Sequence, residues 1–142
     1  MRNFAKRLIA YEALKQRSSP TKTPAAFHVI DKLRPQLTML MGIGGFRALL
    51  LHALALAKAE ASALRALHVA ADATLDGWEA LLAQLGPAEF LKARTVLLVQ
   101  LLGLLVVLIG PGLTSRLLGE IWPQISLDDA PLGNRGKNAK TK

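Results

Sequence analysis

Residues 96–109, VLLVQLLGLLVVLI, form the stretch that decides how this chain folds. Gln100 is its one strongly polar residue, and a helix over this stretch has no polar face. Such a helix must be surrounded by other helices or by lipid. The uncharged sequence runs further, from Thr95 to Ser115, and about 20 apolar residues span the roughly 30 Å hydrocarbon core of a bilayer. The pattern therefore predicts a membrane span or a helix covered by protein.

The apolar helix carries recognisable start and stop signals. Pro87 suits the first helical turn, and Glu89 places a negative charge near the positive end of the helix dipole. Residues 110–112, Gly-Pro-Gly, interrupt the apolar run. We therefore expect a helix over about 87–109, with a length of about 35 Å. A run of only 10–14 apolar residues is also typical of a buried core helix, so the soluble alternative stays open.

If the apolar helix spans a membrane, the residues at its two ends predict where the membrane interfaces lie. The apolar segment 87–115 then spans lipid, and Arg94 snorkels to one interface with its neighbour Lys92. Arg116 and Trp122 are expected near the other interface. Lysine and arginine near the two ends show only a slight bias, from which we predict that the N-terminal region faces the cytoplasm. The alternative is a cytoplasmic protein.

The overall composition predicts an all-α fold. The 142 residues are 51% hydrophobic, lack cysteine and carry a formal net charge of +8, which excludes disordered and disulfide-scaffold classes. No segment alternates with period two, and we identify no internal repeat. We expect a small helical bundle or helical hairpins. Its three parts are a basic amphipathic segment with a linker (1–24), a helical domain (25–122) and a disordered basic tail (123–142).

The first segment has one apolar stripe. Phe4, Leu8 and Tyr11 recur at i, i+4 and i+7, as on a short amphipathic helix. No apolar h-region follows the basic start, so this is not a secretory signal. Whether residues 1–20 dock on the protein, lie on a lipid surface or act as a targeting segment stays open.

Glycine divides the next helical region. Residues 25–41 are expected to be helical, with Pro35 either kinking the helix or marking its true start. Residues 42–45, Gly-Ile-Gly-Gly, then break the helix and form a joint.

An amphipathic helix is predicted over 46–67, with Arg47, Lys58 and Arg65 on one face. This basic stripe is interpreted first as a solvated face, because three cations over six turns do not by themselves predict nucleic-acid binding. A loop is expected at 68–74.

After that loop, Asp76 and Glu79 predict a capping box for a short helix. Another short amphipathic helix is expected over 113–122, beyond the glycines that end the apolar run.

Chemistry-bearing motifs are missing. His28, His52 and His68 have no metal-ligand spacing, and no nucleophile elbow or paired-carboxylate pattern occurs. We therefore predict no catalytic, metal or cofactor site and a protein that is not an enzyme. No small-molecule substrate is indicated.

The predicted function is that of a non-enzymatic, single-pass membrane-associated interaction or accessory subunit. Its partners would be a protein, a second copy of itself or the bilayer. The alternative is a soluble all-α adaptor that oligomerises or docks into a complex through Val96–Ile109. The residues predicted to form the helix seam or membrane span are Val96, Leu97, Gln100, Leu101, Leu104, Leu105 and Leu108.

Overall fold

The computed structural model describes residues 2–16 and 25–123, which form an all-α fold with two long apolar helices. This confirms the predicted fold class and the apolar helix; the predicted disordered tail lies outside the described residues, apart from its first residue. In chain order the elements are α1 (Arg2–Gln16), α2 (Ala25–Glu60), the 3-10 helix η1 (Ser62–Ala66), β1 (His68–Val69), β2 (Leu75–Asp76), α3 (Trp78–Gln84) and α4 (Pro87–Ile121).

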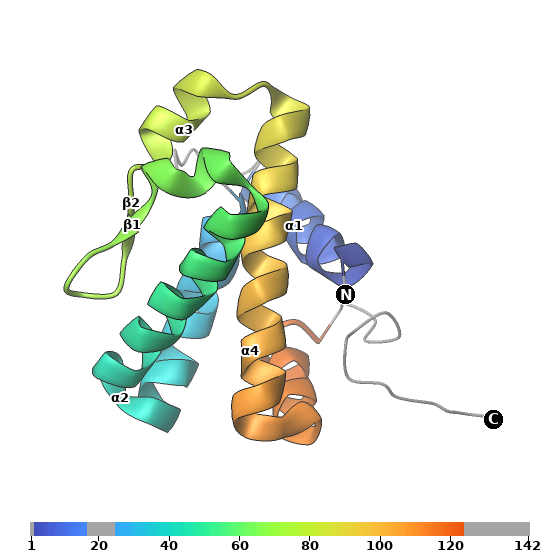
Figure 1. Cartoon of the computed structure of the whole chain (residues 1–142). Coiled ribbons are helices and arrows are strands. Elements are labelled where there is room, and N and C mark those ends of the chain that lie inside the picture. Colours follow the sequence, from blue (N-terminus) through green and yellow to red (C-terminus); the bar gives the residue numbers. More distant parts are fainter. Residues whose placement is uncertain (1, 17–24, 124–142) are drawn as a thin grey trace.

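The apolar helix α4 is a helical hairpin. It begins at Pro87 after Gly86 as N-cap, as the sequence predicts. Gly110 then has φ 87° and ψ 157°, a conformation essentially reserved for glycine. The chain turns there, and a second arm (111–121) runs back beside the first arm (87–109) (Figure 1). Pro111 suits the start of the second arm because a first-turn residue needs no N–H donor.

Helix α2 has the same construction. Gly42 has φ 78° and ψ 163°, and separates a first arm (25–41) from a second arm (43–60). The guanidinium of Arg34 lies 5.9 Å from the centre of the Phe46 ring, which requires the two arms to lie side by side. Pro35 does not mark the start of the helix, because it lies within the helical first arm, and the non-helical break comes at Gly42.

The two hairpins are also locally similar in sequence. Residues 42–50 read GIGGFRALL and residues 110–118 read GPGLTSRLL, so each turn begins Gly-x-Gly and is followed by an arginine and a Leu-Leu pair. Both leucine pairs are buried. This similarity is confined to the two turns and the residues that follow them.

The hairpins pack against each other with both glycine turns at the same end of the molecule (Figure 1). The second arm of α2 lies beside the first arm of α4, where Gln100 Nε2 donates to Glu60 Oε1 at 3.3 Å. The first arm of α2 and the second arm of α4 line opposite sides of one groove. Each arm thus neighbours an arm of the other hairpin, and the pairing is antiparallel.

The predicted stripe of α1 faces this assembly. Phe4 and Leu8 are fully buried and Tyr11 is half-buried. Helix α1 contacts both α2 and α4. The largest fully buried side chains are Trp122, Phe4, Phe46, Leu8, Ile30, Leu33, Leu37, Leu50, Leu64, Leu67, Leu81 and Leu97.

The connection between the hairpins differs from the prediction at the end of α2 and in the expected loop. Helix α2 ends at Glu60 rather than continuing to residue 67, because the next turn is the 3-10 helix η1. The expected loop at 68–74 includes strand β1, which pairs antiparallel with β2. Strands of two residues are too short for an alternation pattern.

The predicted capping box was also wrong, because the N-cap of α3 is Gly77, without a side-chain cap. Gly77 has φ 96°, and a Cβ there would lie 2.0 Å from the carbonyl oxygen of Ala66. Only glycine fits this position.

The turn glycines should be sensitive to alanine for conformational reasons alone. A Cβ at Gly42 or Gly110 meets nothing within 4 Å, so the cost is backbone strain rather than a clash. We expect each alanine variant to lower the free energy of unfolding by about 1–3 kcal/mol. Thermal unfolding in mild detergent, followed by far-UV circular dichroism, measures this.

The neighbouring glycines provide matched controls. Gly44 and Gly112 also have open space for a Cβ, and neither has a positive φ. Gly44→Ala and Gly112→Ala should leave stability unchanged or raise it by up to about 1 kcal/mol. Equal losses at turn and control glycines would contradict the assigned turn geometry.

Candidate functional site

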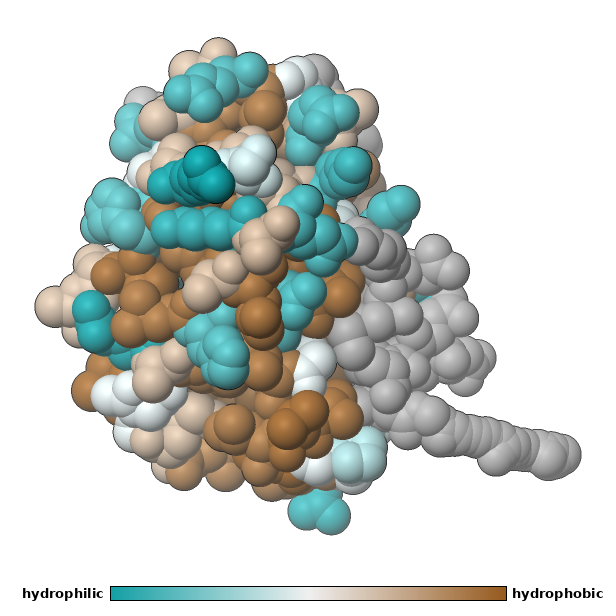
Figure 2. All heavy atoms as spheres, in the orientation of Figure 1, coloured by the Kyte–Doolittle hydropathy of each residue, from teal (hydrophilic) through white to brown (hydrophobic). Residues whose placement is uncertain are grey.

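Exposed apolar side chains gather around the two turns. We call six of them the apolar tip: Met39, Leu40, Ile43, Val107, Leu108 and Leu113. Met39 is 85% exposed and Val107 is 81% exposed, which leaves nearly whole side chains without protein contact. In Figure 2 brown dominates the end that carries the turns, and teal gathers at the opposite end. A contiguous apolar surface of this kind marks contact with protein or membrane.

Both long helices are apolar and long enough to cross a membrane, by length and composition. The segments are Val29–Glu60 and Ala88–Ile121. Only 28% and 33% of their most apolar windows are buried within the chain. A core helix of a soluble protein would be mostly buried, and these two helices are less buried than that, which is compatible with contact with a membrane.

Arginine bounds the uncharged tip on every arm. Counting away from each turn, the first charged residue is Arg34 or Arg47 in α2 and Arg94 or Arg116 in α4. We call these four residues the arginine collar. At 1.5 Å per residue, Arg47, Arg116 and Arg34 lie about 8, 9 and 12 Å from their turns along the helix, and Arg94 about 24 Å.

The two collar arginines of α2 are fixed by the loop between the strands. Arg47 Nε donates to the carbonyl oxygen of Ala70 at 3.0 Å. Arg34 donates to the carbonyl oxygen of Ala73 at 3.3 Å and to Asp31 at 2.7 Å. These contacts join residues 23 and 39 positions apart in the chain, so the α2 hairpin and the strand loop hold each other in place.

That loop is stabilised by a local hydrogen-bonded turn. The hydroxyl and the backbone N–H of Thr74 both donate to Asp72 Oδ1, at 2.7 and 3.2 Å. These hydrogen bonds, that of the side chain first, hold the pKa of the Asp72 carboxyl below its usual value. The contribution to stability is present above the unfolded-state pKa and is lost as the pH falls through the folded-state value.

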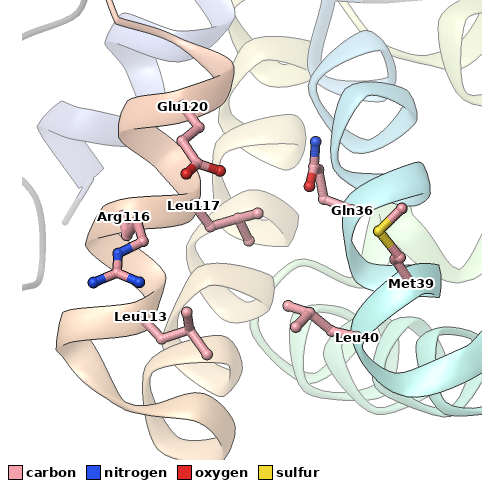
Figure 3. Close-up of a pocket in the computed structure, with 7 residues that line it drawn as sticks. All are labelled: Gln36, Met39, Leu40, Leu113, Arg116, Leu117 and Glu120. Atoms are coloured by element: carbon pink, nitrogen blue, oxygen red, sulfur yellow. The ribbon is translucent and has the colours of Figure 1, made fainter.

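The collar arginines of α4 have different surroundings. Arg94 lies 4.7 Å from the centre of the Phe90 ring, a cation–π contact. Arg116 lines a groove of about 350 Å³ between the first arm of α2 and the second arm of α4. The other lining residues are Gln36, Met39, Leu40, Leu113, Leu117 and Glu120 (Figure 3).

A buried polar network ties the three packed helices together. Glu12 of α1 is 2% exposed, and its Oε2 accepts from Lys32 Nζ at 2.6 Å and from Trp122 Nε1 at 2.9 Å. The expectation of Trp122 at a membrane interface was wrong: it is fully buried at the end of α4 and donates to this carboxylate. Its partner lies 110 residues away in sequence, beyond any local pattern.

Most of the predicted seam on α4 is covered by the chain itself. Val96, Leu97, Leu101 and Leu105 are fully buried. Leu104 and Gln100 are half-buried, and Gln100 finds its hydrogen-bond partner in Glu60. Leu108, at 59% exposure, is the one seam residue that belongs to the apolar tip.

Val107 lies within the predicted docking segment Val96–Ile109, and the other tip residues, Met39, Leu40, Ile43 and Leu113, were missed. A glycine flanked by uncharged apolar residues on both sides is the sequence signal that marks them.

The predicted basic stripe is not one helical face. Arg47 and Lys58 lie in α2, half-buried, whereas Arg65 is exposed in η1, beyond the end of that helix. Arg47 is engaged by the strand loop. The arginine collar, which crosses both hairpins, is the arrangement of cations that the fold produces.

Metal-binding groups are sparse in the described part of the chain, where no three His, Cys, Asp or Glu residues cluster. His52 is exposed, and His68 lies 3.8 Å from Asp76. The side chain of His28 is outside the described set. Comparisons with protein-family models, with curated protein sequences and with solved structures found no match to this chain.

The buried network predicts energetic coupling between Trp122 and Glu12. A hydrogen bond to a charged group contributes about 1.5–3 kcal/mol. Trp122→Phe should lower the free energy of unfolding by that amount more in the wild-type background than in Glu12→Leu, where the acceptor is gone. The double-mutant cycle removes the packing cost of the smaller ring, which is common to both backgrounds. Equal losses in the two backgrounds would contradict the network.

Proposed function

We propose that this protein is a non-enzymatic, membrane-associated accessory subunit whose two helical hairpins dip tip-first into one leaflet of a bilayer. The observation that carries the proposal is the arginine collar above the apolar tip. All four arms change from uncharged to charged sequence at an arginine, and the turns of both hairpins lie at the same end. Arginine suits a membrane interface because its stem packs among apolar groups while its guanidinium reaches phosphate.

The depth of insertion follows from the arm lengths. Half of a hydrocarbon core is about 15 Å thick. Three collar arginines lie about 8–12 Å from the turns, so the tip reaches into one leaflet and the collar lies near its headgroups. The second arm of α4 has 11 residues and is about 17 Å long, too short to cross the core. We therefore propose two re-entrant hairpins in place of a single span over 87–115.

Charge supports one orientation. Because the arms return, both ends of each hairpin lie on the same side of the membrane. The cytoplasmic leaflet carries anionic lipid, and a formal net charge of +8 favours that side. We therefore propose that α1, α3 and the strand loop face the cytoplasm, where they are available to a protein partner.

A lysine at the tip should prevent insertion without disturbing the fold. Val107 is 81% exposed, so Val107→Lys removes little packing. An ammonium carried into the leaflet costs about 2 kcal/mol, which corresponds to a roughly 30-fold lower partition coefficient. Co-flotation of the purified full-length protein with phospholipid vesicles measures it.

Leu56→Lys is the matched control. Like Val107, Leu56 is an exposed aliphatic residue of a hairpin arm, but it lies about 21 Å along the helix from Gly42 and outside the proposed inserted region. Its partition coefficient should equal that of the wild type. Wild-type protein that stays with the soluble fraction would overturn the membrane proposal. If that soluble protein is oligomeric and Val107→Lys makes it monomeric, a second copy covers the tip instead.

A further inference from the structure

The groove between the hairpins is graded in polarity along its length. At the end near the turns, Leu40 faces Leu113 across the groove (Figure 3). Arg116 lies one helical turn further from the tip. Gln36 and Glu120 face each other at the far end, from the first arm of α2 and the second arm of α4.

The two charged residues of the groove, Arg116 and Glu120, form no ion pair with the rest of the described chain. Arg116 and Glu120 are spaced i,i+4 on the second arm of α4, a spacing at which opposite charges commonly pair. Among the residues that the structure describes, neither forms an ion pair, and both side chains are exposed. Arg116 and Glu120 lie about 6 Å apart along the helix axis. In Figure 3 the Glu120 carboxylate points toward the groove, and the Arg116 guanidinium lies at its rim, on the outer side of the arm, where its exposed side chain is available to a ligand that carries both charges.

We propose that this groove binds a phospholipid with an ethanolamine headgroup. The proposal rests on the proposed membrane insertion and names the lipid taken by its hairpins. One acyl chain lies against Leu40 and Leu113, the phosphate lies beside Arg116, and the ammonium group donates to the Glu120 carboxylate and the Gln36 carbonyl oxygen. The order acyl chain, phosphate, amine is the order in which a lipid of the penetrated leaflet presents these groups from the tip outward.

The chemistry favours a primary amine over choline. A primary ammonium has three N–H donors for the two acceptors at the far end of the groove, as a lysine side chain would have. A quaternary ammonium has none and keeps only the charge attraction. The groove volume of about 350 Å³ lies within the range of ligand pockets, about 300–1,000 Å³, and its open end continues into the lipid.

Vesicle partitioning of the full-length protein tests the proposal. The two probes are vesicles of phosphatidylcholine alone and vesicles with half of it replaced by phosphatidylethanolamine, both without net charge. The formal charge of the protein therefore has the same effect on both. We expect wild-type protein to partition about tenfold more strongly into the ethanolamine vesicles, the value of one charge-assisted hydrogen bond at the lower end of its range.

Variants separate recognition from lipid packing. Glu120→Gln should reduce the preference to nearly one, because binding to ethanolamine vesicles loses the charge-assisted hydrogen bond while binding to phosphatidylcholine vesicles loses only the weaker charge attraction. Arg116→Gln should weaken binding to both vesicles, because both lipids carry the phosphate. The controls Glu79→Gln and Arg65→Gln alter exposed charges in α3 and η1 and should change neither value.

Each contrary outcome has a separate meaning. A preference that persists in Glu120→Gln would come from the looser packing of ethanolamine lipids and would overturn the groove proposal. Equal wild-type partitioning into the two vesicles would overturn it as well, and membrane insertion would still stand. Binding to neither vesicle would refute the insertion on which the proposal rests.

Discussion

The architecture depends on two backbone conformations, those of Gly42 and Gly110. With φ near 80° and ψ near 160°, each reverses the direction of a helix that would otherwise continue for about 35 residues. A straight helix of that length would extend about 52 Å and could not bring its apolar residues together. Reversal places four arms side by side, buries the leucines between them and leaves the residues at the turns exposed. The apolar tip is a consequence of the turns.

The arginine collar follows from the same reversal. Three of the four arginines, Arg34, Arg47 and Arg116, come to lie about 8–12 Å from the turns because each is the first charge next to one, whereas Arg94 lies about 24 Å away along the first arm of α4. These four arginines do not cluster in the linear sequence. Other cations, such as Lys92, lie near them, so the sequence alone does not distinguish the four from the rest. Counting outward from the turn glycines is what groups them. The similarity of residues 42–50 and 110–118 gives both hairpins the same order of turn, arginine and buried leucines.

Local signals predicted the elements but not their directions. Pro87, the apolar run and the glycines at 42–45 and 110–112 mark where helices begin and where they break. A glycine permits a positive φ without requiring it, so the break at Gly110 is visible in the sequence and the return of the chain is not. The Glu12–Trp122 hydrogen bond could not be predicted either, because it joins the first and last described helices. Seam residues such as Leu97 were predicted as a helix seam or a membrane span, and the sequence could not distinguish the two because lipid and protein impose the same apolar pattern.

The two hairpins use their arginines differently, and this difference is why the proposed lipid recognition involves the α4 hairpin. In α2, backbone carbonyls of the strand loop accept from Arg34 and Arg47, which offsets part of the cost of bringing two guanidiniums towards lipid. In α4, Arg94 stacks on a ring, and Arg116 lines a groove that also offers an acid. The α2 arginines are therefore fixed by the fold and serve to position the hairpin. Among the described residues Arg116 forms no ion pair, and in the proposed lipid complex its donors bind the phosphate where the second arm of α4 meets the first arm of α2.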